Sequence, residues 1–202
     1  MRKVNKGTQP QELSDFLERE KPTNWDCIHD AENQAVYTIC KEALLKEQCG
    51  LSGYTERIIN ANNVHIDHFK KKGMFREFTF NWNNFVLDEH NSNFGADYKD
   101  KNVKIEDYQF LINPNLEDPH EYLTYQIDGK IIPLNDLTGN KKAKAETTIR
   151  LFNLNYPKLV NQRNSLLNQI AECVNNLSPD EIISAFDNLG YISVAEFAVG
   201  RY

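Results

Sequence analysis

The chain has 202 residues, of which 40% are hydrophobic and 26% charged, enough for one well-buried core or for a small module wrapped by a helical second lobe. No stretch approaches the roughly 18 consecutive apolar residues of a membrane span, and the first residues are polar, so we expect no membrane contact, no signal peptide and a cytoplasmic location. A formal net charge of −6 argues against a protein that binds nucleic acid non-specifically, because phosphate affinity requires clustered Lys and Arg.

The first fifty residues read as helical. Leu13, Phe16 and Leu17 recur at the spacing of one helical face, which predicts a short amphipathic helix near residues 10–20. A longer apolar stripe predicts a second helix from about residue 30 to 48. We therefore expect an N-terminal helical segment over residues 1–50.

Residues 51–105 change to short β-prone runs. Residues 51–63 predict a turn and a short hairpin, residues 64–68 a strand, and residues 84–87 a second strand. A helix should follow, and it would place three polar residues on one face: His90, Asn93 and Asp97. The predicted order of this region is strand, strand, helix.

The remaining residues, 106–202, predict a hairpin followed by helices. Two β-prone runs over residues 122–132 are joined by Asp128-Gly129, a strong hairpin signal. Helices are expected over 141–151 and from there to about 177, and Ser178-Pro179 begins another. The fold class is therefore α+β, one compact unit in which part of the C-terminal helical surface could dock a partner.

The most specific chemistry lies in four polar residues of the middle region. Hydrolysis of a phosphodiester with one ion needs a base for water and ligands for a hard cation. His68 suits the base, because imidazole titrates near the working pH. Asp67 and Asn93 offer oxygen ligands to Mg²⁺ or Mn²⁺, and Asn84 could accept a hydrogen bond from the His68 ring and fix its tautomer.

Neighbouring residues extend this candidate site. His90 is a further candidate ligand, and His65 a candidate supporting residue. Basic residues collect close by and could contact the phosphates of a nucleic acid: Lys70, Lys71, Lys72 and Arg76. The simpler alternatives are a hydrogen-bonded surface histidine at the strand end and a solvated basic loop.

Asp67-His68, Asn84 and Asn93 resemble the three parts of the ββα-metal HNH nuclease motif. More narrowly, segments 47–56, 65–69 and 82–87 resemble the HNH proteins called PtuB, which belong to Septu antiphage systems and to some retrons. The resemblance implies an HNH module over residues 51–105, embedded in a mainly helical protein. It also assigns His68 as base, Asn84 as its orienting residue, and Asp67 with Asn93 as ligands.

The resemblance further implies a function and partners. The chain would be a Mg²⁺-dependent endonuclease effector of a bacterial antiphage system, acting on nucleic acid together with a PtuA-like ATPase. In retron versions, a reverse transcriptase with its RNA-linked DNA is an additional partner. The residues do not distinguish DNA from RNA, because HNH chemistry has no use for a 2′-hydroxyl.

Many of these relatives brace the module with a structural zinc held by four cysteines. The corresponding positions here are Ser52, Thr55, Glu89 and Ser92, so we expect no structural zinc. Two alternatives stay open. One is a catalytically inactive ββα subunit that binds nucleic acid or a partner, and the other is a zinc site built from His65, His68, His90 and Asp67.

Overall fold

The computed structural model describes residues 1–60 and 62–200. Both predicted N-terminal helices form, as α1 (Gln11–Glu20) and α2 (Gln34–Glu47). Leu13 and Phe16 are completely buried, which confirms the predicted face of α1. Within the described ranges, none of the helices combines the length and the apolar character needed to cross a bilayer.

A two-stranded antiparallel hairpin lies at the centre of the fold. β1 (Val64–His68) pairs with β2 (Phe85–Glu89), and α3 (Gly95–Asn102) follows, so the predicted order is confirmed. The helix begins at Gly95, later than the sequence predicts. Gly95 has φ +71°, and a Cβ atom at this position would lie 2.3 Å from Asp88 Oδ2, so the turn into the helix requires glycine. The expected helical face is therefore wrong, since His90 and Asn93 precede the helix.

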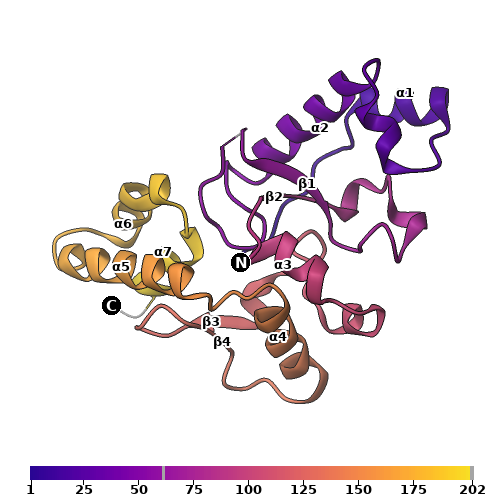
Figure 1. The fold of residues 1–202 in the computed structure, drawn as a ribbon. Coiled ribbons are helices and arrows are strands. Elements are labelled where there is room, and N and C mark those ends of the chain that lie inside the picture. The colour runs from indigo at the N-terminus through magenta and orange to yellow at the C-terminus, as the bar shows by residue number, and fades with distance from the viewer. Residues whose placement is uncertain (61, 201–202) are drawn as a thin grey trace.

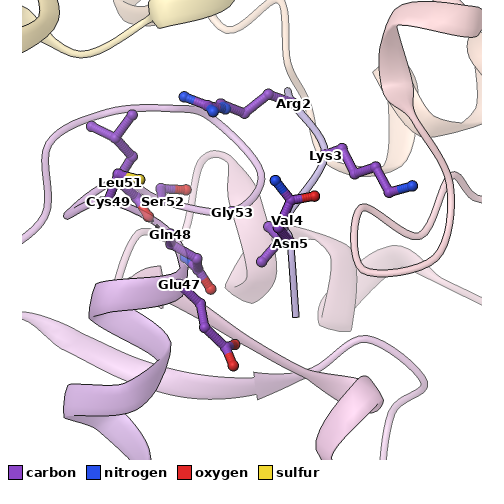
Figure 2. A pocket seen from close by; sticks show the side chains of 10 residues that line it. All are labelled: Arg2, Lys3, Val4, Asn5, Glu47, Gln48, Cys49, Leu51, Ser52 and Gly53. Carbon is purple, nitrogen blue, oxygen red and sulfur yellow. Dashed lines mark hydrogen bonds between the residues drawn. The ribbon is translucent and has the colours of Figure 1, made fainter. Parts of the chain in front are cut away.

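Before β1, residues 50–59 form the predicted turn, closed by a short antiparallel pairing in which Ser52 N–H donates to the Arg57 carbonyl and Ile59 N–H to the Gly50 carbonyl. This pairing contains the antiparallel bridge of Leu51 with Ile58. The buried side chain of Gln48 fastens this turn to β2 by donating to the carbonyls of Leu51 and Leu87 and accepting from Leu87 N–H. Figure 2 shows residues 2–5 running alongside the turn.

The C-terminal half contains the predicted hairpin and four helices. These elements are β3 (Leu123–Tyr125), β4 (Ile131–Pro133), α4 (Gly139–Leu151), α5 (Pro157–Cys173), α6 (Pro179–Phe186) and α7 (Ile192–Val199). The capping box of Ser178 and Glu181 starts α6, as predicted. Helix α7 packs on α5, α6 and β3, and the sequence pattern does not predict it as a separate helix.

The central hairpin is shared by two hydrophobic cores (Figure 1). One core joins α1 and α2 to the hairpin face that carries Ile66, Phe85 and Leu87. The other joins the opposite face, with Val86, to Ala96 of α3 and to the C-terminal half. Each face of the hairpin therefore has its own neighbours, and this arrangement positions the candidate site.

Candidate functional site

The two residues of the Asp67-His68 pair belong to different faces of β1. Successive side chains of a strand point to opposite sides, so His65 and Asp67 face α3 while Ile66 and His68 face the N-terminal core. His65 and His68 are also separated by three residues, which is about 10 Å along a strand. The predicted site is therefore divided between two environments.

His68 lies in an aromatic pocket on the N-terminal side. Its ring meets Trp25 edge-to-face at a centroid distance of 4.5 Å and Phe85 at 5.2 Å, and the residue is 6% exposed. Nε2 is 2.8 Å from the carbonyl oxygen of Thr79. Because a carbonyl only accepts, this contact assigns the proton to Nε2 and leaves the lone pair on Nδ1.

Burial is the main influence on the charge of His68. It lowers the pKa of His68 to about 4, outweighing the Thr79 hydrogen bond and the Asp67 charge, which both raise it. At neutral pH the imidazole is uncharged. A neutral, oriented ring with a lone pair is what a proton-accepting group requires.

Asn84 acts on the loop that follows β1 and not on the ring. Within the described chain, the three hydrogen bonds of its side chain go to backbone atoms of Lys70 and Phe78, at 2.7 to 3.1 Å. The predicted contact with His68 is therefore wrong. Asn84 instead ties together the ends of the loop whose Thr79 carbonyl orients the His68 ring.

Asp67 forms a buried ion pair. Lys99 of α3 places its Nζ 2.7 Å from Asp67 Oδ2, and Tyr54 donates its hydroxyl to the same oxygen at 2.5 Å. The Lys99 ammonium also reaches the carbonyls of His68 and Phe69 at 3.0 and 3.3 Å. The Lys99 ammonium thus pairs with Oδ2 of Asp67, the oxygen that Tyr54 also contacts, and this oxygen is not free for a metal ion.

The pKa of Asp67 reflects this pairing. Burial alone would raise it, but the charge of Lys99 and the hydrogen bonds from Lys99 and Tyr54 outweigh burial and hold the pKa below its ordinary value. Lys99 is completely buried, and the carboxylates near it keep its pKa above the usual value despite burial. Both groups are therefore charged, which is the arrangement that a buried ion pair needs.

Asn93 lies exposed in the turn before α3, and its hydrogen bonds to Asn91 and Asn153 use its backbone. The structure brings together a different set of possible ligands. Among the described residues, one group of three His, Cys, Asp or Glu side chains could share an ion: His65, His90 and Asp97.

This cluster draws one residue from each part of the ββα unit. His65 belongs to β1, His90 follows β2, and Asp97 lies in the first turn of α3. The ligand atoms all lie within 4.8 Å of one another, with Asp97 oxygens 3.7 Å from His65 Nε2 and 3.4 Å from His90 Nδ1. The sequence marked Asp97 only by its spacing from His90, and gave it no role.

The positions at which the PtuB resemblance leads us to expect zinc-binding cysteines hold polar contacts. Ser52 donates to the buried Asp88 carboxylate at 2.5 Å, and its oxygen accepts from two backbone N–H groups. Glu89 accepts two hydrogen bonds from Arg57, at 2.5 and 2.6 Å. A hydrogen-bonded network and an ion pair thus fasten the 52–57 turn to β2.

The four basic candidates divide into two pairs. Lys70 lies over the Phe78 ring at 3.9 Å, and Lys71 donates to the Asp100 carbonyl at 2.6 Å, so both support the fold. Lys72 and Arg76 are exposed. They line a groove of about 300 Å³ with Thr23, Asn24, Trp25, Asp26, Gly73 and Thr79, and two of those residues, Trp25 and Thr79, contact His68.

No protein-family model matches the chain. A similar protein from Escherichia coli bears the name "Retron Ec83 putative HNH endonuclease". It is 27% identical over 211 residues, covering 86% of this chain and 81% of the relative. The likeness extends over most of both chains, so this chain is similar to a protein named as an HNH nuclease of a retron.

Proposed function

We propose that this chain is an endonuclease that hydrolyses nucleic-acid phosphodiesters with His68 as the general base. The proposal rests on the His68 ring at the end of β1. This ring is neutral and oriented by the Thr79 carbonyl, and it lies beside the groove that Lys72 and Arg76 line. The likeness to a protein named as a retron HNH endonuclease supports the same activity.

The chemistry assigned to His68 is proton transfer. Nδ1 accepts the proton of a water molecule, whose oxygen attacks the phosphorus in line with the leaving 3′ oxygen. A phosphate anion near the ring favours the imidazolium, which raises the pKa of His68 from its low resting value. Lys72 and Arg76 attract the strand and neutralise charge on its phosphates.

Three residues position the base. Thr79 orients the ring, Asn84 fixes the loop that carries Thr79, and Trp25 covers one edge of the imidazole. Trp25 comes from the N-terminal segment, so the catalytic environment includes residues outside the ββα unit. The proposal therefore predicts that residues 1–50 are required for activity.

A divalent cation is part of the proposal by resemblance. Mg²⁺ or Mn²⁺ at Asp67 with Asn93 does not fit, because Lys99 holds the Asp67 carboxylate and Asn93 is exposed ahead of the helix. The donors that fit are His65, His90 and Asp97. A bound ion would supply positive charge to phosphate oxygens there.

We extend the proposal to the biological setting. The chain is an antiphage effector that acts with a PtuA-like ATPase and, in a retron, with a reverse transcriptase and its RNA-linked DNA. The PtuB resemblance and the retron named for the relative support this setting. Incubating the assembled complex with labelled DNA and RNA pools identifies the substrate.

One observation favours a second function, a non-catalytic ββα subunit that binds nucleic acid or a partner. The ammonium of Lys99 fills the place beside Asp67 in which HNH nucleases carry their ion, so the module keeps its shape without a metal there. The two functions differ in one outcome, which is whether purified wild-type protein cleaves any nucleic acid.

The test compares His68→Ala and His68→Gln with wild type in the assembled complex. We expect either variant to lose about 10²- to 10⁴-fold in cleavage rate, because the base is gone. His68→Gln keeps a donor for the Thr79 carbonyl and so protects the loop. His120→Ala is the matched control, because His120 is exposed in the 119–121 turn before β3.

Unchanged cleavage by both His68 variants, with melting temperatures near wild type, would contradict the assignment of the base. If wild-type protein binds the nucleic-acid pools but cleaves neither, across Mg²⁺, Mn²⁺ and Zn²⁺, the non-catalytic function is correct.

A further inference from the structure

His65, His90 and Asp97 have the separation of ligands around one small ion. Two ligand atoms bound to the same ion at about 2.1 Å lie roughly 3.0 to 3.4 Å apart when they subtend 90° to 109°. The Asp97 oxygens lie 3.4 Å from His90 Nδ1 and 3.7 Å from His65 Nε2. Both distances are within a few tenths of an ångström of this separation, although the His90 ring must also turn, because it stacks on the His65 ring.

The cluster joins one well-fixed ligand to a more adaptable one. Asp97 Oδ2 accepts the backbone N–H of Asn91 at 2.9 Å, which holds the carboxylate against the turn after β2. His90 exposes 58% of its side chain and stacks on the His65 ring at a centroid distance of 4.0 Å. Because parallel rings cannot both direct a nitrogen at one ion, His90 must rotate, and its exposure leaves room for that.

His65 is incompletely satisfied by protein atoms. Its Nε2 is 3.7 Å from Asp97, beyond hydrogen-bond distance, and its buried Nδ1 is without a hydrogen-bond partner in the described part of the chain. A stable core histidine normally has its ring nitrogens paired. An ion on Nε2 would supply one of the two missing interactions, while Nδ1 would keep its proton without a partner among the described residues.

We propose that His65, His90 and Asp97 bind one divalent ion of the first transition row, at a site distinct from His68 and from Asp67. The ion links β1, the end of β2 and α3, the three parts of the ββα unit. It binds where no ammonium competes, because Lys99 is committed to Asp67 and to two backbone carbonyls.

The donor set selects the class of ion. Two imidazoles and a carboxylate suit Zn²⁺, Ni²⁺, Co²⁺ and Mn²⁺, whereas Mg²⁺ prefers oxygen ligands and releases its water reluctantly. We expect Zn²⁺ to bind more tightly than Mn²⁺, and both more tightly than Mg²⁺. This order differs from the Mg²⁺ preference that the family resemblance implies.

Three protein ligands leave at least one coordination position open. His90 and Asp97 expose 58% and 31% of their side chains, so the open side faces solvent. If the chain is the proposed nuclease, that position takes a phosphate oxygen of the bound strand. This last step rests on the proposed function, whereas the binding of the ion does not.

The test is metal binding by the full chain, stripped with chelator, with no cleavage measured. Co²⁺ titration followed by visible absorption should show one equivalent bound, and calorimetry should rank Zn²⁺, Mn²⁺ and Mg²⁺. His90→Ala and Asp97→Asn should each weaken Zn²⁺ binding at least about tenfold. Asp97→Asn retains an acceptor for Asn91 N–H, so the local fold is kept.

Two controls separate this site from general histidine binding and from the catalytic proposal. His120 lies 3.9 Å from Asp118 and 3.8 Å from Glu196, as a single histidine among carboxylates, so His120→Ala should leave Zn²⁺ affinity unchanged. His68→Gln should also leave it unchanged. Wild-type affinity in both His90→Ala and Asp97→Asn, no stoichiometric Co²⁺ binding, or Mg²⁺ bound as tightly as Zn²⁺ would overturn the inference.

Discussion

The two faces of the central hairpin treat buried polar groups in opposite ways. His68 lies among aromatic rings, and burial drives its pKa down to about 4, so it stays neutral. Asp67, the preceding residue, is as deeply buried but keeps its charge, because Lys99 and Tyr54 pair with it. Neighbours in sequence thus acquire different protonation states because a strand sends them to different surroundings.

The face that meets α3 also changes along its length. Near the end of β1, Lys99 occupies the space beside Asp67 and closes it to other cations. Near the start of β1, His65 Nε2 and Asp97 Oδ1 lie 3.7 Å apart, and the neighbouring His90 side chain is 58% exposed to solvent. An ion therefore finds free ligands at one end of this face and a filled position at the other.

The largest expected effect comes from breaking the buried pair. Lys99→Met leaves the Asp67 charge buried without its partner, and we expect a loss of about 3–5 kcal/mol in the free energy of unfolding. Urea denaturation measures it, with Lys142→Met on the exposed surface of α4 as the control. Adding Asp67→Asn should recover part of the loss, and equal losses in Lys99→Met and Lys142→Met would contradict the account.

The next effect concerns Asp88, on the α3 face of β2. Burial raises the pKa of Asp88 to about 7, against hydrogen bonds from Ser52 and Ala96 that lower it. A folded pKa above the unfolded one means that this stability is complete below about pH 4 and is lost as pH rises through 7. The loss should be on the order of 2–4 kcal/mol.

Unfolding by urea between pH 4 and pH 8 measures the Asp88 effect. Asp88→Asn should flatten the decline in stability over this window, whatever its absolute stability. A decline with the same slope in the variant would show that another group is responsible.

The smallest effect tests the contacts that stand at the zinc-binding positions of relatives. Arg57 and Glu89 are partly buried, with 17% and 12% of their side chains exposed. A double-mutant cycle with Arg57→Ala and Glu89→Ala should give a coupling energy of about 1 kcal/mol. A coupling near zero would mean that the contacts of Ser52 with Asp88 and of Gln48 with Leu87 fasten the turn without help from this ion pair.

The elements that the sequence predicts well depend on local signals. The strand Val64–His68 has the predicted bounds, Asp128-Gly129 forms the expected hairpin turn, and the Ser178 capping box starts its helix. Each signal lies within a few residues of the structure it determines. Local chemistry is sufficient for such elements.

The details of the site depend on contacts between distant segments. Lys99 lies in a polar helix that reads as solvated, and its burial follows only from Asp67, 32 residues earlier. The hydrogen bonds of Asn84 to the loop and the edge-to-face contact of Trp25 with the His68 ring likewise join separate segments. Residue types and spacing predict which side chains could carry chemistry, but not which of them meet.

One measurement tests most directly whether the base and the ion occupy different faces of the hairpin. Crystals of the full chain grown with Mn²⁺ or Zn²⁺ would locate the ion by anomalous diffraction. We predict a peak bounded by His65, His90 and Asp97, with Lys99 still paired to Asp67. A peak beside Asp67 and His68, with the Lys99 ammonium displaced, would contradict the account.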